Sequence, residues 1–149
     1  MRHAFILTLA LAGVGSTLAH ADLESSTPAA NETLQVAPAE VSLTFTEAAE
    51  VRFSTFKVYP LDADLNFSAD DAEARVNGLA GQLASEVLET QGDDDARADT
   101  GVSTPERTTE TVTLSLKPDL GTDVYVVMWR VLSVDSHTSQ GFVTFRVSP

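Results

Sequence analysis

The sequence predicts an all-β protein with an immunoglobulin-like, Greek-key β-sandwich fold. Three observations support this prediction: several short segments alternate apolar and polar residues, turn-forming residues separate these segments, and little of the chain repeats apolar residues at helical spacing. The chain has 149 residues, of which 43% are hydrophobic, and this size suits one domain with one core. It has no cysteine, which excludes disulfides and thiolate metal sites.

The first 19 residues have the layout of a secretory signal peptide. Met1-Arg2-His3 is a short basic start, and Ala4 to Val14 is an apolar run that small residues follow. The apolar run is shorter than the ~20 residues that cross a bilayer, which argues against a membrane anchor. We therefore expect residues 1–19 to be removed and the mature protein, residues 20–149, to be exported and soluble.

Two cleavage points satisfy the small-residue rule for signal peptides. Cleavage after Ala19 leaves His20 as the first residue of the mature chain, whereas cleavage after Ala21 leaves Asp22. The choice matters chemically, because an N-terminal histidine offers a free amine and an imidazole that can bind one metal ion together. The sequence leaves both cleavage points open.

The mature chain is expected to form a single sandwich domain of short strands. Residues 124–134 are apolar on both faces, which predicts a central strand, and Trp129, the only tryptophan, is expected to anchor the core. Residues 29–38 are expected to form a loop. The expected strands cover residues 23–28, 40–47, 51–59, 109–116, 124–134 and 141–147, and the residues expected to face the core are Val41, Leu43, Phe45, Val112, Leu114, Leu116, Val143, Phe145 and Val147.

Residues 61–105 differ from the rest of the chain and are expected to be an acidic insertion. This stretch is rich in Asp and Glu and contains only two basic residues. We expect the start of a hairpin at residues 75–78, a short strand at residues 85–88, and a flexible loop at residues 91–105, where the apolar content is too low for packing. An alternative interpretation is a weak cation site made of carboxylates such as Asp93, Asp94 and Asp95.

The net charge of the chain limits its partners. There are 22 acidic and 9 basic side chains, which give a formal charge of −13. Nucleic acids and anionic membrane surfaces are bound by clustered Lys and Arg, so this balance argues against both kinds of partner.

Asp135 and His137 form the candidate metal site. They are two residues apart between two apolar segments, and in an extended chain such residues point to the same face. The only other histidine of the expected mature chain is His20. The amine and imidazole of His20, the carboxylate of Asp135 and the imidazole of His137 would offer three nitrogens and one oxygen, a donor set that favours copper(II). By itself, an aspartate and a histidine at this spacing are also common on surfaces that bind no metal.

Four stretches of the mature chain resemble the CopC family of exported copper-binding proteins. The resemblance spans both ends of the mature chain and leaves out the middle, residues 61–105. The stretches are His20-Ala21-Asp22-Leu23-Glu24-Ser25-Ser26-Thr27-Pro28-Ala29, then Ala37-Pro38-Ala39-Glu40-Val41-Ser42-Leu43-Thr44-Phe45-Thr46-Glu47, then Gly121 through Trp129-Arg130-Val131, and finally Ser133-Val134-Asp135-Ser136-His137 with Gly141-Phe142-Val143-Thr144-Phe145-Arg146-Val147.

The resemblance implies a β-sandwich that holds copper(II) in a histidine brace. It assigns His20 as the N-terminal chelating residue and Asp135 and His137 as the remaining ligands. It also places Glu47 close to the copper, where its carboxylate would hydrogen-bond the N-terminal amine or a bound water, although an exposed charge at a strand end is an equal alternative. The implied role is copper resistance or homeostasis in the periplasm by binding rather than catalysis, with an inner-membrane copper importer as a partner.

A copper(I) site is not expected in this chain. Thioether sulfur is the ligand that copper(I) prefers, and the chain has two methionines. Met1 belongs to the expected signal peptide, and Met128 lies in the expected central strand, where core packing explains it.

Two rival functions stay open at the level of the sequence. A copper-dependent enzyme that cleaves polysaccharides oxidatively also uses a histidine brace, but it needs an open copper position and a flat aromatic surface, and this chain is only 7% aromatic. The second rival is an exported immunoglobulin-like module that binds no metal. A mature chain that begins at Asp22 would favour the second rival.

Overall fold

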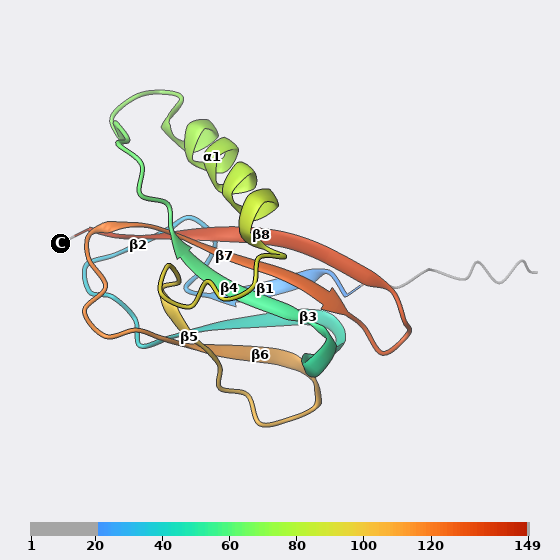
Figure 1. The fold of residues 1–149 in the computed structure, drawn as a ribbon. Helices are drawn as coiled ribbons and strands as arrows, with labels where there is room; N and C mark the ends of the chain where they lie inside the picture. Colours follow the sequence, from blue (N-terminus) through green and yellow to red (C-terminus); the bar gives the residue numbers. More distant parts are fainter. Residues whose placement is uncertain (1–20, 149) are drawn as a thin grey trace, which may run out of the picture.

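The structure is a computed structural model and describes residues 21–148 (Figure 1). Its strands form two facing sheets, which confirms the predicted β-sandwich. The elements are β1 (Leu23–Thr27), β2 (Glu32–Leu34), β3 (Glu40–Glu50), the 3₁₀ helix η1 (Val51–Phe53), β4 (Thr55–Pro60), α1 (Ala72–Val87), β5 (Asp99–Val102), β6 (Thr108–Leu116), β7 (Asp123–Leu132) and β8 (Thr138–Val147).

One sheet has the strand order β1-β3-β6-β5, and the other has the order β2-β8-β7-β4. All neighbouring strands run antiparallel except β2, which pairs in parallel with the last three residues of β8. The loop expected at residues 29–38 therefore contains a short strand. The strand expected at residues 51–59 is shorter than predicted, because η1 precedes β4. None of the helices among residues 21–148 is long and apolar enough to cross a membrane.

The main core lies between the two sheets and contains the side chains that the alternation pattern predicts. Trp129 is only 6% exposed and meets the ring of Phe45 edge-on, with ring centroids 5.8 Å apart. Of the nine predicted core residues, Val143 is half-buried against this core; the eight buried ones are Val41, Leu43, Phe45, Val112, Leu114, Leu116, Phe145 and Val147. The predicted core is confirmed because residues two apart in a strand share one face.

β7 is apolar on both faces because it separates two cores. One face contributes Trp129 to the main core, and the other contributes Met128, which is 0% exposed and packs against α1. As expected, β7 is an interior strand, between β8 and β4. The burial of Met128 also agrees with its expected role in packing.

The helix α1 corrects the prediction for residues 75–88, where we expected a hairpin start and a short strand. Val76, Ala80 and Ala84 recur every fourth residue, so they form one buried face of a helix. This face covers the outer side of the sheet that contains β7 and β8 (Figure 1). The helical spacing was present in the sequence, but small residues carry it, and Gly78 suggested a turn instead.

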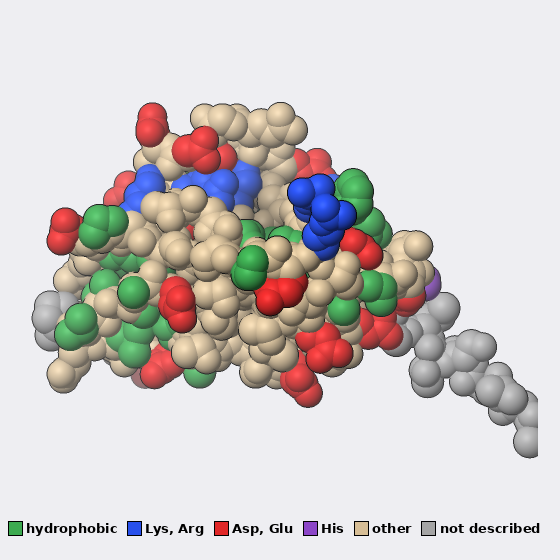
Figure 2. Space-filling model, turned by 90° about the horizontal axis from the view of Figure 1, so that it is seen from below, with side chains coloured by type: hydrophobic (Ala, Val, Ile, Leu, Met, Phe, Trp, Pro, Cys, Tyr) green, Lys and Arg blue, Asp and Glu red, His purple; other side chains and the backbone are tan. Residues whose placement is uncertain are grey.

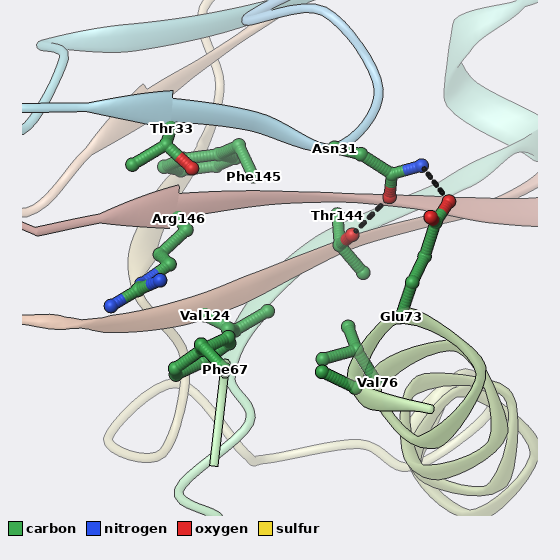
Figure 3. Close-up of a pocket in the computed structure, with 10 residues that line it drawn as sticks. Asn31, Thr33, Phe67, Glu73, Val76, Val124, Thr144, Phe145 and Arg146 are labelled. Carbon is green, nitrogen blue, oxygen red and sulfur yellow. Dashed lines mark hydrogen bonds between the residues drawn. The ribbon is translucent and has the colours of Figure 1, made fainter. Parts of the chain in front are cut away.

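The first turn of α1 is joined to β8 through Asn31 (Figure 3). Asn31 Nδ2 donates to Glu73 Oε1 at 3.2 Å, and Thr144 Oγ1 donates to Asn31 Oδ1 at 3.0 Å. The guanidinium of Arg146 lies 3.6 Å from the centroid of the Phe67 ring in the same pocket. These contacts attach the start of the helical segment to the sandwich.

The C-terminal end of α1 is held by a buried lysine. Lys57 Nζ, on β4, donates to the carbonyl oxygens of Val87 and Thr90 at 2.8 and 2.5 Å and to Asp93 Oδ2 at 2.6 Å. Burial alone would raise the pKa of Asp93, but the hydrogen bonds from Lys57 and Tyr59 outweigh it and lower this pKa. A buried ion pair therefore fastens residues 87–93 to the sheet.

The expectation of a flexible loop at residues 91–105 is wrong. Part of this stretch is β5, which pairs with β6, and Asp99 is 3% exposed. Asp99 Oδ2 accepts a hydrogen bond from the backbone amide of Val58 at 2.7 Å and also pairs with Arg97. Low apolar content misled the prediction, because buried hydrogen bonds and ion pairs fix this segment.

The alternative interpretation of the acidic insertion as a cation site finds no support. Within residues 21–148, no group of three or more His, Cys, Asp or Glu side chains could hold a metal ion. Asp93 is already paired with Lys57, and Figure 2 shows acidic side chains scattered over one face of the molecule rather than gathered into one patch.

Candidate metal centre

Asp135 and His137 lie in the turn that joins β7 to β8. The turn is closed by two backbone hydrogen bonds, from the Ser133 amide to the His137 carbonyl and from the Ser136 amide to the Ser133 carbonyl, each 2.9 Å long. Ser136 has a φ of 72°, in the left-handed region. The prediction that the two side chains meet is confirmed, but a tight turn brings them together rather than an extended strand.

The carboxylate of Asp135 contacts His137 twice. His137 Nδ1 lies 2.8 Å from Asp135 Oδ2, and the backbone amide of His137 donates to Asp135 Oδ1 at 3.1 Å. The hydroxyl of Ser133 also donates to Oδ1. The hydrogen bonds from Ser133 and from the His137 amide lower the pKa of Asp135 from 3.8 to about 2, so this side chain is ionised at neutral pH.

Ser133 is the residue of this turn that sequence reasoning missed. Its side chain is buried, and its Oγ lies 3.0 Å from the His137 carbonyl oxygen in addition to its contact with Asp135. Ser133 also forms an isolated bridge with Ala49, and the Val134 amide donates to the Ala48 carbonyl at 3.1 Å. Its position two residues before Asp135 was the available signal, because such serines often bond to nearby turn residues.

Glu47 lies on β3, next to Ala48, whose carbonyl accepts the hydrogen bond from Val134 in this turn. Its Oε2 is buried and has no hydrogen-bond partner among the described residues. Buried carboxylate oxygens almost always have a partner, and leaving one unpaired is costly. Glu47 is half-buried and lies within β3, which continues to Glu50, so it is not a fully exposed charge at the end of a strand.

The first described residues of the chain lie against the same end of the sandwich (Figure 1). Ala21 is 1% exposed, and its carbonyl oxygen accepts a hydrogen bond from Ser139 Oγ at 2.6 Å. The Asp22 amide donates to Thr46 Oγ1 at 3.1 Å, and the Thr46 amide donates to the Asp22 carbonyl at 2.9 Å. His20 itself lies outside the described residues.

Three segments far apart in the sequence therefore meet at one end of the molecule: residues 21–22, residues 46–49 and residues 133–139. Ser139 contacts Ala21, Thr46 contacts Asp22, and Val134 contacts Ala48. Each link involves the backbone of at least one segment, so the approach does not depend on long, mobile side chains.

The pair formed by Asp135 and His137 places a carboxylate oxygen and an imidazole nitrogen together at the turn. The separation of His137 Nδ1 and Asp135 Oδ2 is 2.8 Å, which is an ordinary hydrogen-bond distance. Both atoms are of types that bind metal ions, although within residues 21–148 no third donor completes a metal-binding group.

Comparison with known proteins identifies the same family as the sequence motifs, and the match includes residues 61–105, which the motifs left out. The model of the CopC domain matches residues 23–85 and 65–148. "Copper transport protein CutJ" of Bacillus subtilis (strain 168) is 28% identical over 132 residues, which are 89% of this chain. The match covers 19% of CutJ, so the chain spans about a fifth of the length of this relative.

Two solved structures share the fold. CopC from Methylosinus trichosporium OB3b superposes with a TM-score of 0.58 and 22% identity over 87% of this chain and 95% of its own. PcoC, a methionine-rich copper resistance protein from Escherichia coli, gives a TM-score of 0.58 and 24% identity over 87% of this chain and 100% of its own. With a family model that matches most of its length, the chain belongs to the CopC family, whose members bind or transport copper and are not enzymes.

Proposed function

We propose that this chain is exported to the periplasm, where it binds one copper(II) ion for copper resistance or homeostasis. The ligands are the N-terminal amine and imidazole of His20, the carboxylate of Asp135 and the imidazole of His137. The observation that carries the proposal is the paired arrangement of Asp135 and His137 at the end of the sandwich where Ala21 is fixed. Ala21 is bonded directly to His20 in the chain.

The burial of Ala21 supports signal cleavage before His20. Cleavage after Ala21 would remove a residue that is 1% exposed in the core and would leave Ser139 Oγ without the carbonyl it contacts. Cleavage after Ala19 retains both. The proposed boundaries are therefore residues 1–19 for the signal peptide and residues 20–149 for the CopC-like domain, which includes the acidic segment at residues 61–105.

Glu47 is proposed to support the copper ligands without binding the copper itself. Its neighbour Thr46 forms hydrogen bonds with Asp22, two residues after His20. The buried Oε2 that has no partner among residues 21–148 is suited to accept a hydrogen bond from the N-terminal amine. Hydrogen bonds of this kind orient metal ligands and raise their affinity for the metal.

The proposed mechanism is reversible chelation. The donor set contains three nitrogens and one oxygen, which favours copper(II) in a tetragonal plane. The amine and both imidazoles must lose protons before they bind, so affinity falls in mild acid. Met128 is buried between the sheet and α1, which is consistent with a protein that binds copper(II) without a thioether site.

Titration of the mature protein with copper(II) tests the proposal. We expect one tightly bound ion per chain, and we expect this binding to be lost in both His20→Ala and His137→Ala. An added residue in front of His20 moves the free amine away from the imidazole and should weaken binding in a folded protein. Glu110→Ala, which removes an exposed carboxylate on β6, serves as the control and should bind as the parent does. Undiminished binding in both histidine variants would refute the proposed ligands.

A membrane copper importer is the proposed partner. CutJ is named a copper transport protein, and the segment similar to this chain makes up 19% of it. In Bacillus subtilis, the segment similar to this chain is part of the transport protein itself. We infer that this chain performs the same step as a separate protein, by delivering copper to a transport protein. Loss of copper uptake in cells that lack this chain, restored by the parent but not by His137→Ala, would support this role.

A further inference from the structure

Ser139 brings a hydroxyl to the inward face of β8, which otherwise carries apolar residues and a glycine. Ser139 lies opposite Val131 on β7, and residues directly opposite in an antiparallel pair share one face. Val131 is 0% exposed in the main core, so Ser139 also faces the space between the two sheets. The other residues of this face are Gly141, Val143, Phe145 and Val147. A hydroxyl at such a position needs a hydrogen-bond partner.

The partner of the Ser139 hydroxyl is the N-terminal segment. Ser139 Oγ donates to the Ala21 carbonyl oxygen at 2.6 Å, and Ala21 is 1% exposed. β8 belongs to one sheet, whereas the next residue, Asp22, is held by β3 of the other sheet. The Asp22 amide donates to Thr46 Oγ1 at 3.1 Å, and the Asp22 carbonyl accepts from the Thr46 amide at 2.9 Å. Both sheets therefore hold the two residues that follow His20 in the chain.

A fixed Ala21 restricts the amine of His20 through the covalent chain. The peptide unit that joins the two residues is planar. With Ala21 in place, the amine moves only by rotation about the single bonds on either side of this unit, which are the ψ angle of His20 and the φ angle of Ala21. A ligand that is confined before the metal ion arrives loses less freedom when it binds, which favours binding.

The segment that supplies the other proposed ligands also supplies this contact. Asp135 and His137 precede Ser139 by four and two residues. The hydrogen-bonded turn that contains them is followed directly by β8, whose pairing with β7 begins at Thr138 and has no register shift. One short and regular piece of backbone therefore sets the distance between the paired side chains of the turn and the N-terminal segment.

We propose that Ser139 and Thr46 are positioning residues that hold the N-terminal segment, and with it the amine of His20, at the metal centre. The inference rests on the proposed copper(II) site, because it concerns how that site is assembled. Neither hydroxyl is itself a copper ligand. Each is bonded to the backbone of residues 21–22 in the absence of metal, so copper(II) meets a chain end that is already in place.

Competition between the mature protein and a copper(II) chelator tests this role. Ser139→Ala should lower the copper(II) affinity about tenfold, as the loss of other contacts that orient metal ligands does, and Thr46→Val should lower it as well. Ser139→Thr keeps a hydroxyl and should retain most of the affinity. The matched controls Ser42→Ala and Thr44→Val remove hydroxyls of β3 that contact β6 instead, and they should bind copper(II) as the parent does.

Two further measurements separate positioning from a purely structural effect. In the metal-free protein, the Asp22 amide should exchange with solvent faster in Ser139→Ala and Thr46→Val than in the parent, while the amides of β7 exchange as in the parent and show that the variants are folded. In the copper-loaded protein, the EPR spectrum of Ser139→Ala should show more than one copper environment, because a loosely held amine does not bind in a single arrangement. Loss of stability alone would leave this spectrum unchanged.

The results for the copper site and for the positioning residues can be told apart. A parent protein that does not bind copper(II) tightly would overturn both. A parent that binds tightly, with folded variants Ser139→Ala and Thr46→Val that match its affinity and its EPR spectrum, would overturn the positioning roles alone. Equal losses of affinity in the β3 controls would also overturn them. If Ser139→Ala does not fold, Thr46→Val decides, because Thr46 is exposed.

Discussion

At the scale of single residues, the turn at residues 133–137 explains why Asp135 and His137 meet. The buried hydroxyl of Ser133 contacts both the Asp135 carboxylate and the His137 carbonyl oxygen. The spacing of Asp135 and His137 in the sequence was sufficient to predict that they meet. It was not sufficient to predict how, because a left-handed residue such as Ser136 leaves no clear mark in a sequence.

The titration of Asp135 tests this hydrogen-bonded turn. Because its folded pKa of about 2 lies below the ordinary 3.8, the ionised carboxylate stabilises the turn above pH 3.8, and this contribution is lost as the pH falls through about 2. An NMR titration of the carboxyl carbon in the metal-free protein should give a midpoint near 2.

Ser133→Ala provides the matched comparison for this titration. Loss of the strongest hydrogen bond to the carboxylate should raise the pKa of Asp135 toward its ordinary value. Ser103→Ala changes an exposed serine that is far from Asp135 in the sequence, and it should leave the titration midpoint of Asp135 unchanged. A parent midpoint near 4, or no change in Ser133→Ala, would contradict the described hydrogen bonds.

At the scale of elements, α1 and the segment after it depend on buried polar contacts as much as on apolar packing. Alternation predicted strands such as β3 and β6 well, because in each of them alternate residues form one buried face. It failed for residues 72–102, where alanines form the helix face and Lys57 holds the helix end from a distant strand. Such long-range pairs of charged residues have no local pattern that a sequence can reveal.

Substitution of Lys57 should therefore be costly. In the pair with Asp93, the side chains are 5% and 10% exposed, and Lys57→Ala leaves the buried carboxylate without its counter-ion, with only the Tyr59 hydroxyl still bonded to it. We expect the free energy of unfolding to fall by about 3 kcal/mol, measured by urea denaturation. Lys117→Ala, which removes contacts on exposed carbonyl groups, should cost less than about 1 kcal/mol. Equal effects of the two substitutions would argue against the buried anchor.

Gly141 has a separate role in the packing of β8 against β7. A Cβ atom at this position would lie 2.7 Å from Trp129 Cζ2, which is too close for a ring fixed in the core. Gly141→Ala should destabilise the protein by about 2 kcal/mol and shift the tryptophan fluorescence. Gly121→Ala, where nothing lies within 4 Å of the added atom, is the control. A parent-like stability of Gly141→Ala would show that the core around Trp129 is looser than described.

At the scale of the whole molecule, the sandwich brings together three segments that are far apart in the sequence. The N-terminal residues, the end of β3 and the β7–β8 turn are linked through Ala21, Thr46 and Val134. Strand alternation predicted the fold class, and the family motifs predicted which ends of the chain contribute to the site. The contact between these segments depends on the packing of the two sheets, which no local pattern specifies.

The most direct test of the proposed copper site is a crystal structure of the mature protein loaded with copper(II). We predict a chain that begins at His20 and one copper ion bound by the His20 amine and imidazole, Asp135 and His137, with Glu47 hydrogen-bonded to the amine. The distance between His137 Nδ1 and Asp135 Oδ2 should stay near 2.8 Å, its value in the structure described above. A mature chain that begins at Asp22, or copper bound elsewhere on the acidic surface, would contradict the account.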